Sequence, residues 1–198
     1  IQYKQLGYQA AVFSFDRPPL NMLKHKHMRV IYTTNEKIKL LARRGIDIYI
    51  EHPFTDEFSH LSPEDFVIKV LLEKTGMKVL VVGDDCGFGY KRQGNVELLK
   101  RMSKEYDFKL IVIPKLELKG EIVSSTRIRR LLSEGKVEEA NRLMEDPFMI
   151  CGPVVHGNHM GAEVLQMPTA NQIPSENKLL PPNGVYVSRI HYKDEMYY

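Results

Sequence analysis

The sequence contains no tryptophan and only two cysteines among its 198 residues. Cys86 and Cys151 lie far apart in the chain and cannot form the disulfide framework of a small secreted domain, which favours the reducing cytoplasm. No apolar run approaches the ~20 residues that a membrane-spanning helix requires. No charged-then-apolar signal segment opens the chain. We therefore expect a cytoplasmic protein with no membrane partner.

A strong excess of charge of either sign is also absent. The chain has 28 Lys and Arg against 25 Asp and Glu, and a net charge of +3 is too small to indicate a polyanion partner such as nucleic acid. Hydrophobic residues make up 43% and charged residues 27%, which is typical of a folded globular chain. The length is sufficient for one large domain or two small ones.

The first two-thirds of the chain alternate strand-like and helix-like segments. Apolar or alternating runs predict strands at residues 10–15, 46–50, 79–82 and 109–113. Helical spacing, cap residues and closing glycines predict helices at residues 35–44, 62–76 and 95–106. The order β-α-β-α-β-α-β predicts an α/β domain with a parallel sheet wrapped by helices. The continuous apolar run at 79–82 is typical of a parallel strand covered on both faces.

The pattern changes after a helix expected over roughly residues 126–144. Beyond it lie only short strand-like pieces separated by turn residues, and residues 185–190 alternate as an antiparallel strand with one wet face would. We place a boundary near Glu145 and predict an α/β domain over residues 1–145. Residues 146–198 are too few for an independent sandwich or barrel, so we expect the first part of a small antiparallel β domain.

Three hydroxyl residues and three arginines mark the start of that helix, in the sequence Val-Ser-Ser-Thr-Arg-Ile-Arg-Arg from Val123 to Arg130. Backbone N–H groups at a helix start are unsatisfied, and the helix dipole makes that end positive. Hydroxyl and guanidinium groups add the donors that hold a phosphate. Because basic residues in a first turn oppose the dipole, a bound anion would offset the conflict. An ordinary cap with solvated arginines is the alternative interpretation.

A glycine-rich loop from Gly83 to Gly94 follows the strand expected at 79–82. Such loops at the carboxyl ends of parallel strands are where α/β folds bind ligands. Its glycines allow close backbone approach, Phe88 could stack on a planar ring, and Lys91 with Arg92 could meet phosphate. The alternative interpretation is an ordinary loop in which Lys91 and Arg92 are solvated. The dinucleotide spacing Gly-x-Gly-x-x-Gly is absent, so we do not expect NAD.

A third candidate lies in the β half. Thr169 and Asn171 supply hydroxyl and amide oxygens of the kind that hold Mg²⁺ beside nucleotide phosphates, although a turn with an Asx hydrogen bond would use the same residues. The histidines have no partner spacing that completes a zinc set, and neither a Gly-x-Ser-x-Gly elbow nor a Walker A loop is present.

Taken in order, these segments resemble the bacterial family of bifunctional riboflavin kinase/FMN adenylyltransferases, the FAD synthetases. Phe15-Asp16 with Pro19 resembles the family's Phe-Asp-Pro-His-Pro loop, and Thr33-Thr34 with Glu36-Lys37 resembles its Leu-Thr-Thr-x-x-Glu-Lys segment. Residues 82–89 resemble Val-Gly-x-Asp-Phe-x-Phe-Gly, with Cys86 in place of the first Phe. Residues 123–129 match Ile-Ser-Ser-Thr-x-Ile-Arg, the most specific motif of the set. Residues 152–157, 168–171 and 179–186 resemble the opening of the riboflavin kinase barrel.

The resemblance implies a Rossmann-like nucleotidyltransferase domain followed by the first part of a riboflavin kinase β-barrel. It implies two reactions: riboflavin and ATP give FMN, and FMN with a second ATP gives FAD and pyrophosphate. The expected small-molecule partners are therefore ATP, riboflavin and FMN, with Mg²⁺ as cofactor.

The resemblance also implies a set of site residues. The adenylyl-transfer cradle would comprise Ser125, Thr126 and Arg129 as catalytic residues, with Ser124 and Arg127 also binding ATP. The flavin would contact Phe15, Asp16, Gly83, Asp85 and Phe88. In the kinase half, ATP would bind Gly157, Gly161, Thr169 and Asn171, and the last two would hold Mg²⁺.

Some family features are missing. The Gly-x-Phe-Asp-Gly-x-His-x-Gly-His loop and the kinase's general-base Glu are absent, and Gln166-Met167 replace the usual Gly-Phe. We therefore expect a chain truncated at both ends, without its first strand and inactive by itself. Two alternatives remain: another adenylyltransferase of the nucleotidyltransferase fold, which would lack the β half, and a non-catalytic flavin- or nucleotide-binding module.

Overall fold

The structure is a computed structural model and describes residues 3–17, 28–118, 120–156, 170–193 and 195–197. Its α/β part contains four strands in two parallel pairs: β1 (Ala11–Phe15) with β2 (Ile48–His52), and β3 (Val79–Gly83) with β4 (Lys109–Ile113). The helical segments of this part are η1 (Lys4–Leu6), α2 (Thr34–Arg43), α3 (Asp56–Ser59), α4 (Pro63–Asp65), the π-helix η2 (Phe66–Lys74), η3 (Tyr90–Arg92) and α5 (Val96–Glu105). The predicted order of strands and helices is confirmed.

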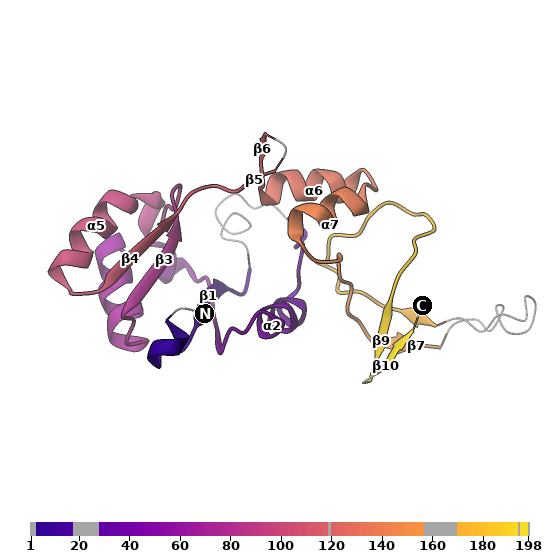
Figure 1. Cartoon of the computed structure of the whole chain (residues 1–198), viewed down its shortest axis with the longest axis horizontal. Coiled ribbons are helices and arrows are strands. Elements are labelled where there is room, and N and C mark those ends of the chain that lie inside the picture. The colour runs from indigo at the N-terminus through magenta and orange to yellow at the C-terminus, as the bar shows by residue number, and fades with distance from the viewer. Residues whose placement is uncertain (1–2, 18–27, 119, 157–169, 194, 198) are drawn as a thin grey trace, which may run out of the picture.

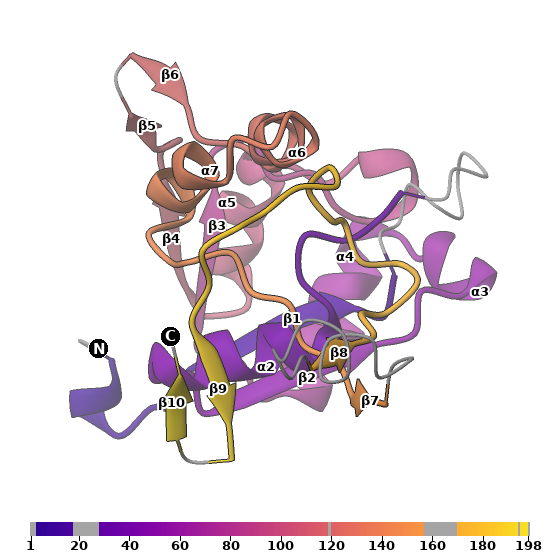
Figure 2. The same ribbon diagram turned by 90° about the vertical axis from the view of Figure 1, so that its right-hand side faces the viewer.

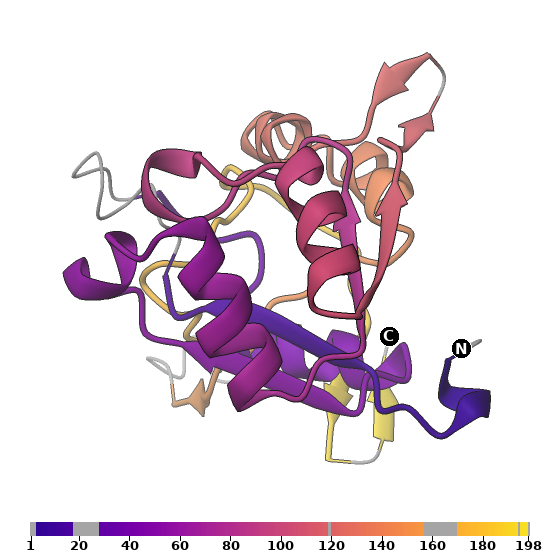
Figure 3. The ribbon, with the colours of Figure 1, turned by 90° about the vertical axis from the view of Figure 1, so that its left-hand side faces the viewer.

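The expected parallel pairing of the strands is confirmed, but in the described part of the chain the strands do not join into a single sheet. The β1–β2 pair and the β3–β4 pair are separate two-stranded sheets, and Figure 3 shows them as distinct pairs. The β3 strand is also not covered on both faces, because Val81 is 51% exposed, as is Ile113, which lies opposite Gly83 on β4. An apolar run predicts that a strand can be buried, but it does not determine which strands pair or which elements cover them.

Local signals set the helix starts. The Thr33 side chain and Glu36 form a capping box at the start of α2, so the cap lies one residue earlier than expected. Ser62 caps α4, which has Pro63 in its first turn. Asn95 caps α5 by accepting from the backbone N–H of Leu98 at 3.0 Å. Each cap satisfies donors that have no partner within the helix.

The first core lies between η2, α5 and the β3–β4 pair, at the end of the molecule seen on the left of Figure 1. Its buried residues are Val67, Leu98, Leu99, Met102 and Phe108. All of them come from residues 67–108, so this core forms from consecutive segments of the chain. Phe66 extends it towards β1 by an edge-on contact with Phe13, with 5.7 Å between ring centroids.

The second core lies in the paired helices α6 (Ser125–Ser133) and α7 (Val137–Met144). The single helix expected over 126–144 is therefore wrong: it is interrupted at Gly135, whose φ of 76° suits glycine and turns the chain back. The buried residues are Ile128, Leu131, Leu132, Ala140 and Leu143, against which Ile31 and Leu179 also pack. This core thus recruits residues from both ends of the chain.

The remaining strands are short antiparallel pairs. They are β5 (Glu117–Leu118) with β6 (Glu121–Ile122), β7 (Val154–Val155) with β8 (Asn171–Gln172), and β9 (Ile190–Tyr192) with β10 (Glu195–Tyr197). The strand predicted over 185–190 is wrong except for its last residue, and Val185 and Val187 are fully exposed. An alternating pattern forms a strand only where a neighbour supplies the ladder, and none lies beside this segment in the described residues. A closed barrel is likewise not seen there.

The segment between β8 and β9 runs up to the α6–α7 helices and back (Figure 2). Within the described residues, no helix is long and apolar enough to cross a membrane.

Candidate functional site

The start of α6 carries the hydroxyl groups of the predicted phosphate cradle. Ser124 is the N-cap in an extended conformation, and its side chain accepts from the backbone N–H of Arg127 at 3.2 Å. Ser125 and Thr126 follow as the first two helical residues and are exposed. Ser124 therefore performs the cap, and the next two hydroxyls face outwards beside the positive end of the helix dipole.

The three arginines of this segment have different surroundings. Arg127 makes an ion pair with Glu121 of β6 at 2.8 Å, and its Nε is buried with no hydrogen-bond partner among the described residues. Arg130 lies 4.0 Å from Glu134 on the same helix. The Arg129 guanidinium donates to the backbone carbonyl of Arg29, and burial lowers its pKa from the ordinary value. The charge of Arg127 is thus balanced by the Glu121 carboxylate, so this arginine does not require a bound anion.

The loop after β3 lies at the carboxyl end of its strand, next to the corresponding end of β4. Gly83 is the last residue of β3, and the backbone N–H of Asp84 donates to the carbonyl of Ile113 at 3.0 Å. Asp85 makes an ion pair with Lys115 at 3.2 Å in which both side chains are well exposed. This ion pair therefore joins the loop after β3 to the segment that follows β4.

Close packing fixes the rest of this loop. Gly89 has a φ of 69°, and a Cβ there would lie 2.6 Å from the Cα of Pro63, so the loop backbone presses on the start of α4. Phe88 and Gly94 form an antiparallel bridge. Cys86 packs against the first core, where burial, together with the charge of Asp85, raises the pKa of its thiol.

An aromatic cluster connects the two predicted flavin-contacting phenylalanines. Phe15 contacts Phe58 at 5.6 Å between ring centroids, Phe58 contacts Phe66 at 5.9 Å, and Phe66 contacts Phe88 at 6.0 Å. Phe15 and Phe88 are both half-buried. The cluster therefore makes one continuous apolar surface between the ends of β1 and β3.

Asp16 follows Phe15 at the end of β1. Burial would raise the pKa of its carboxyl, but the hydrogen bond from the backbone N–H of Phe54 and the adjacent Arg17 guanidinium hold the pKa below its ordinary value. The Phe54 N–H lies 3.0 Å from Asp16 Oδ1. The carboxylate is therefore charged at neutral pH and fixed in place beside the aromatic cluster.

The loop after β3, predicted to contact flavin, and the predicted phosphate cradle at the start of α6 are connected by one short segment. Lys115, which pairs with Asp85, precedes Leu116, whose carbonyl accepts from the backbone N–H of Val123 at 2.8 Å. Val123 immediately precedes the Ser124 cap. The structure thus links the two predicted sites through the base of the β5–β6 hairpin.

Most of the predicted kinase residues lie outside the described residues, namely Gly157, Gly161 and Thr169. Asn171 is described: it is exposed on β8, where its backbone pairs with Val155. No group of three or more His, Cys, Asp or Glu side chains able to hold a metal occurs in the part of the chain that the structure describes.

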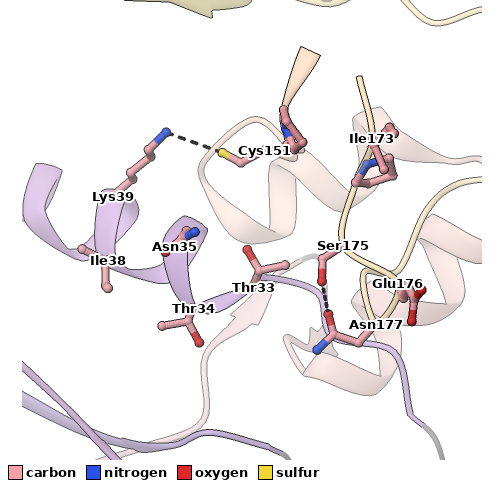
Figure 4. Close-up of a pocket in the computed structure, with 13 residues that line it drawn as sticks. Thr33, Thr34, Asn35, Ile38, Lys39, Cys151, Ile173, Ser175, Glu176 and Asn177 are labelled. Atoms are coloured by element: carbon pink, nitrogen blue, oxygen red, sulfur yellow. Dashed lines mark hydrogen bonds between the residues drawn. The ribbon is translucent and has the colours of Figure 1, made fainter. Parts of the chain in front are cut away.

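Sequence reasoning missed a cleft of about 850 Å³ between the start of α2 and the C-terminal part of the chain. Figure 4 shows its walls, which include Thr33 and Asn35 on one side and Cys151 and Asn177 on the other. Across it the Lys39 ammonium lies 3.8 Å from the Cys151 sulfur. Because the two walls come from residues far apart in the chain, no local pattern could have indicated the cleft.

Comparison with known proteins identifies the family. The sequence pattern of the FAD synthetase family matches residues 2–127, and that of riboflavin kinase matches residues 144–198. The first match covers more than half of the chain, which therefore belongs to the FAD synthetase family. The resemblance stated from the motifs is confirmed.

Individual relatives of the chain carry the name of a bifunctional protein. The chain is 41% identical over 178 residues to a bifunctional riboflavin kinase/FMN adenylyltransferase of Buchnera aphidicola subsp. Schizaphis graminum, covering 89% of this chain and 56% of that protein. It is 34% identical over 193 residues to the protein of the same name from Listeria monocytogenes, covering 96% and 60%. The Escherichia coli K12 protein of that name is 31% identical, with 90% and 54% covered. The chain thus spans somewhat more than half the length of these relatives.

A similar solved structure is described as a macrolide-efflux protein from Streptococcus pneumoniae. Its TM-score is 0.84 at 28% sequence identity, and the similarity covers 99% of this chain and 64% of that one. The arrangement of the two halves in this chain therefore has a counterpart in a solved structure.

Proposed function

We propose that this chain belongs to an enzyme that makes FAD, with an FMN adenylyltransferase domain over residues 1–145 and the beginning of a riboflavin kinase domain over residues 146–198. The observation that carries the proposal is the succession of the two family matches along one chain, in the order of the bifunctional relatives. A lone adenylyltransferase of another kind has no reason to carry the second match.

In adenylyl transfer, a phosphate oxygen of FMN would attack the α-phosphorus of ATP, and pyrophosphate would leave. The attacking group belongs to the substrate, so no protein nucleophile is required. Catalysis then consists of holding the two substrates in line and stabilising the charge that develops on the leaving pyrophosphate. The start of α6 offers the groups for this task.

Ser125 and Thr126 are exposed at the positive end of α6, where their hydroxyls and the first-turn N–H groups suit phosphate oxygens. Arg129 adds a guanidinium whose position is set by the carbonyl of Arg29. Ser124 contributes mainly by capping the helix, and Arg127 by fixing the β6 hairpin through Glu121. We assign the charge-stabilising role to Arg129.

The flavin would lie against the surface between the ends of β1 and β3. Phe15 and Phe88 offer apolar ring faces within one cluster, while Gly83 allows close approach of the backbone. Asp16 and Asp85 would accept hydrogen bonds from polar groups of the ring system. Breaking the exposed Asp85–Lys115 ion pair to admit the flavin would cost little, since such pairs contribute only about 0–1 kcal/mol to stability.

In the kinase half, we propose that Thr169 and Asn171 provide oxygens for Mg²⁺ and that Gly157 and Gly161 lie near the ATP phosphates. Asn171, the one described member of this set, is exposed and its amide oxygen is a ligand type that suits this hard cation. When bound, Mg²⁺ would neutralise phosphate charge. The chain's own contribution is the placement of Asn171 by pairing of β8 with β7.

The test is FAD formation by the intact protein from FMN, ATP and Mg²⁺, followed by chromatography, together with the Arg129→Ala variant. We expect FAD from the unaltered protein, and a loss of about 2–4 kcal/mol of transition-state stabilisation in the variant, as for removal of a preorganised charge-stabilising group. Arg130→Ala is the matched control, because Arg130 is exposed one position along the helix and faces Glu134. An Arg129→Ala rate equal to that of the control would contradict the assignment, and bound FAD without any turnover would indicate a binding module.

A further inference from the structure

A fully buried ion pair joins the two halves of the chain. The Lys178 ammonium, in the C-terminal half, lies 2.6 Å from the carboxylate of Glu36 in the first turn of α2. Both side chains are 0% exposed. Burying two charges carries a desolvation penalty that is recovered only when the geometry is good and every remaining donor and acceptor is used.

Here the polar groups of the pair are used fully. The Lys178 ammonium also donates to the carbonyls of Ile31 and Met149, each at 2.6 Å, so all three of its donors have acceptors. The Glu36 carboxylate accepts from the backbone N–H groups of Thr33 at 2.8 Å and Cys151 at 2.7 Å. The result is a fixed junction.

Aromatic rings close the junction on the remaining sides. The ammonium lies 4.3 Å from the ring centroid of Phe148 and 5.3 Å from that of Tyr32. Cation–π contact supports a desolvated ammonium and excludes water from it. Burial raises the pKa of Tyr32, which stays a neutral phenol beside the pair. The junction is therefore dry as well as fully paired.

The backbone next to Lys178 holds the segment that precedes α2. The N–H of Val30 donates to the carbonyl of Asn177 at 2.7 Å, and the N–H of Leu179 donates to the carbonyl of Val30 at 2.8 Å. With the contact from the Lys178 ammonium to the Ile31 carbonyl, residues 30 and 31 are held by three consecutive residues of the C-terminal half.

The same short segment supports the phosphate cradle from its other side. The carbonyl that receives the Arg129 guanidinium belongs to Arg29, directly before Val30. Ile31 and Leu179 both pack into the α6–α7 core that carries Arg129. Figure 2 shows the C-terminal segment running beneath these helices. Residues 29–31 thus lie between Lys178 and Arg129 and contact both.

We propose that Lys178 is a positioning residue for adenylyl transfer: by fixing residues 29–31, it places the guanidinium of Arg129 over the pyrophosphate that leaves. This inference rests on the proposed function and adds to it a residue from the kinase half. Positioning errors of about 1 Å can lower rates by about 10²-fold, so a group remote from the substrate can influence the reaction strongly. Lys178 itself does not touch the substrate.

The test is a double-mutant cycle in the intact protein. Lys178→Met alone would leave a buried unpaired carboxylate, so the pair is changed together as Glu36→Gln/Lys178→Met, which is neutral at both positions. We expect this change to lower kcat/KM for ATP in adenylyl transfer about tenfold when Arg129 is present, and by less than about twofold in the Arg129→Ala background. The matched control is Glu97→Gln/Lys100→Met, an exposed pair on α5 with N···O of 2.9 Å, which we expect to change neither value.

A merely structural role gives a different result. If the neutral pair lowers kcat/KM by the same factor in both backgrounds, Lys178 does not act through Arg129 and the proposal is overturned. If the unaltered protein makes FAD but the cycle is additive, only this inference fails. If the unaltered protein makes no FAD, the proposed function fails and the inference falls with it.

A second measurement needs no change at the buried pair. Hydrogen exchange at the Val30 and Leu179 amides is followed in the unaltered protein and in Arg129→Ala, each with and without ATP and Mg²⁺. We expect ATP to slow exchange severalfold in the unaltered protein and not in the variant, because bound phosphate restrains Arg129 and through it the Arg29 segment. Equal exchange with and without ATP in the unaltered protein would overturn the proposal, even if the paired substitution prevents folding.

Discussion

The two cores of this molecule are built in opposite ways. The first, around Leu99, uses consecutive segments of the chain and depends on helix caps and apolar spacing. The second, around Leu132, combines the α6–α7 helices with Ile31 and Leu179 from distant parts of the chain. A buried Lys178–Glu36 pair accompanies the second core, whereas all the buried members of the first are apolar.

This difference shows where stability and function are coupled. The first core is packed from residues 66–110, so we expect it to form without the C-terminal half. The second core carries Arg129 and requires the C-terminal half to be complete. Damage to the C-terminal half should therefore reach the start of α6, while damage to the first core should remain local.

Removing one partner of the buried pair should have the largest effect. Lys178→Met leaves the Glu36 carboxylate buried and uncompensated, so we expect a loss of about 3–5 kcal/mol of stability. The loss should appear as faster hydrogen exchange in α6 and α7, with α5 nearly unchanged. Lys100→Met, at an exposed pair on α5, should change stability by less than about 1 kcal/mol. Equal loss of protection in α5 and α6 would show that the two cores are not separable.

Truncating a large side chain in each core should have the next largest effect. Leu99 is 1% exposed and Leu132 is 0% exposed, and each change to Ala should cost about 2–5 kcal/mol through lost burial and a residual cavity. Urea unfolding measures the size of each loss, and hydrogen exchange locates it. Leu132→Ala should release the Leu179 amide and Leu99→Ala should not; the opposite pattern would refute the division into a local and a composite core.

Removing a helix cap tests the local character of the first core. Asn95→Ala deletes the acceptor for the Leu98 N–H and should cost about 1 kcal/mol, seen as a lower urea midpoint. Asn95→Ser keeps an acceptor and serves as the control, with most of the stability retained. If Asn95→Ala also speeds hydrogen exchange in α6, the first core supports the second.

The smallest expected effect concerns pH. The pKa of Asp16 is held below its ordinary value in the folded chain, so its stabilisation is present above the unfolded pKa of about 3.9 and is lost as pH falls through the folded value. Asp16→Asn should remove this contribution, of less than about 1 kcal/mol, at pH 6, and should have a smaller effect at pH 2. Urea unfolding of both proteins at the two pH values measures it. If the stability difference between the two proteins is as large at pH 2 as at pH 6, the effect does not come from the charge of Asp16.

The features that sequence predicted well depend on local signals. Ser62 with Pro63, Asn95, and the closing Gly76 act within a few residues of themselves, and the helices begin and end near them. The Ser-Ser-Thr segment likewise became a capped helix start with exposed hydroxyls. Capping chemistry is determined by neighbours in the chain, so a single sequence contains the information needed.

The features that were missed depend on distant partners. Glu36 and Lys178 are 142 residues apart, and neither has any local mark of its ion pair. Arg127 looked like a phosphate ligand because Glu121, its partner, lies in a hairpin that the apolar pattern does not predict. The strand expected at 185–190 required a neighbour, and Val185 is fully exposed without one in the described residues. Pairing between segments is a property of the whole fold.

The raised pKa of Cys86 has a consequence for the chemical reactivity of the loop after β3. Oxidants and alkylating reagents attack the thiolate, and at neutral pH Cys86 stays protonated and half-buried against the first core. Cys86 therefore behaves as a small apolar side chain. Because little of this thiol is ionised at neutral pH, we expect thiol-labelling reagents to modify it more slowly in the folded protein than in the unfolded chain.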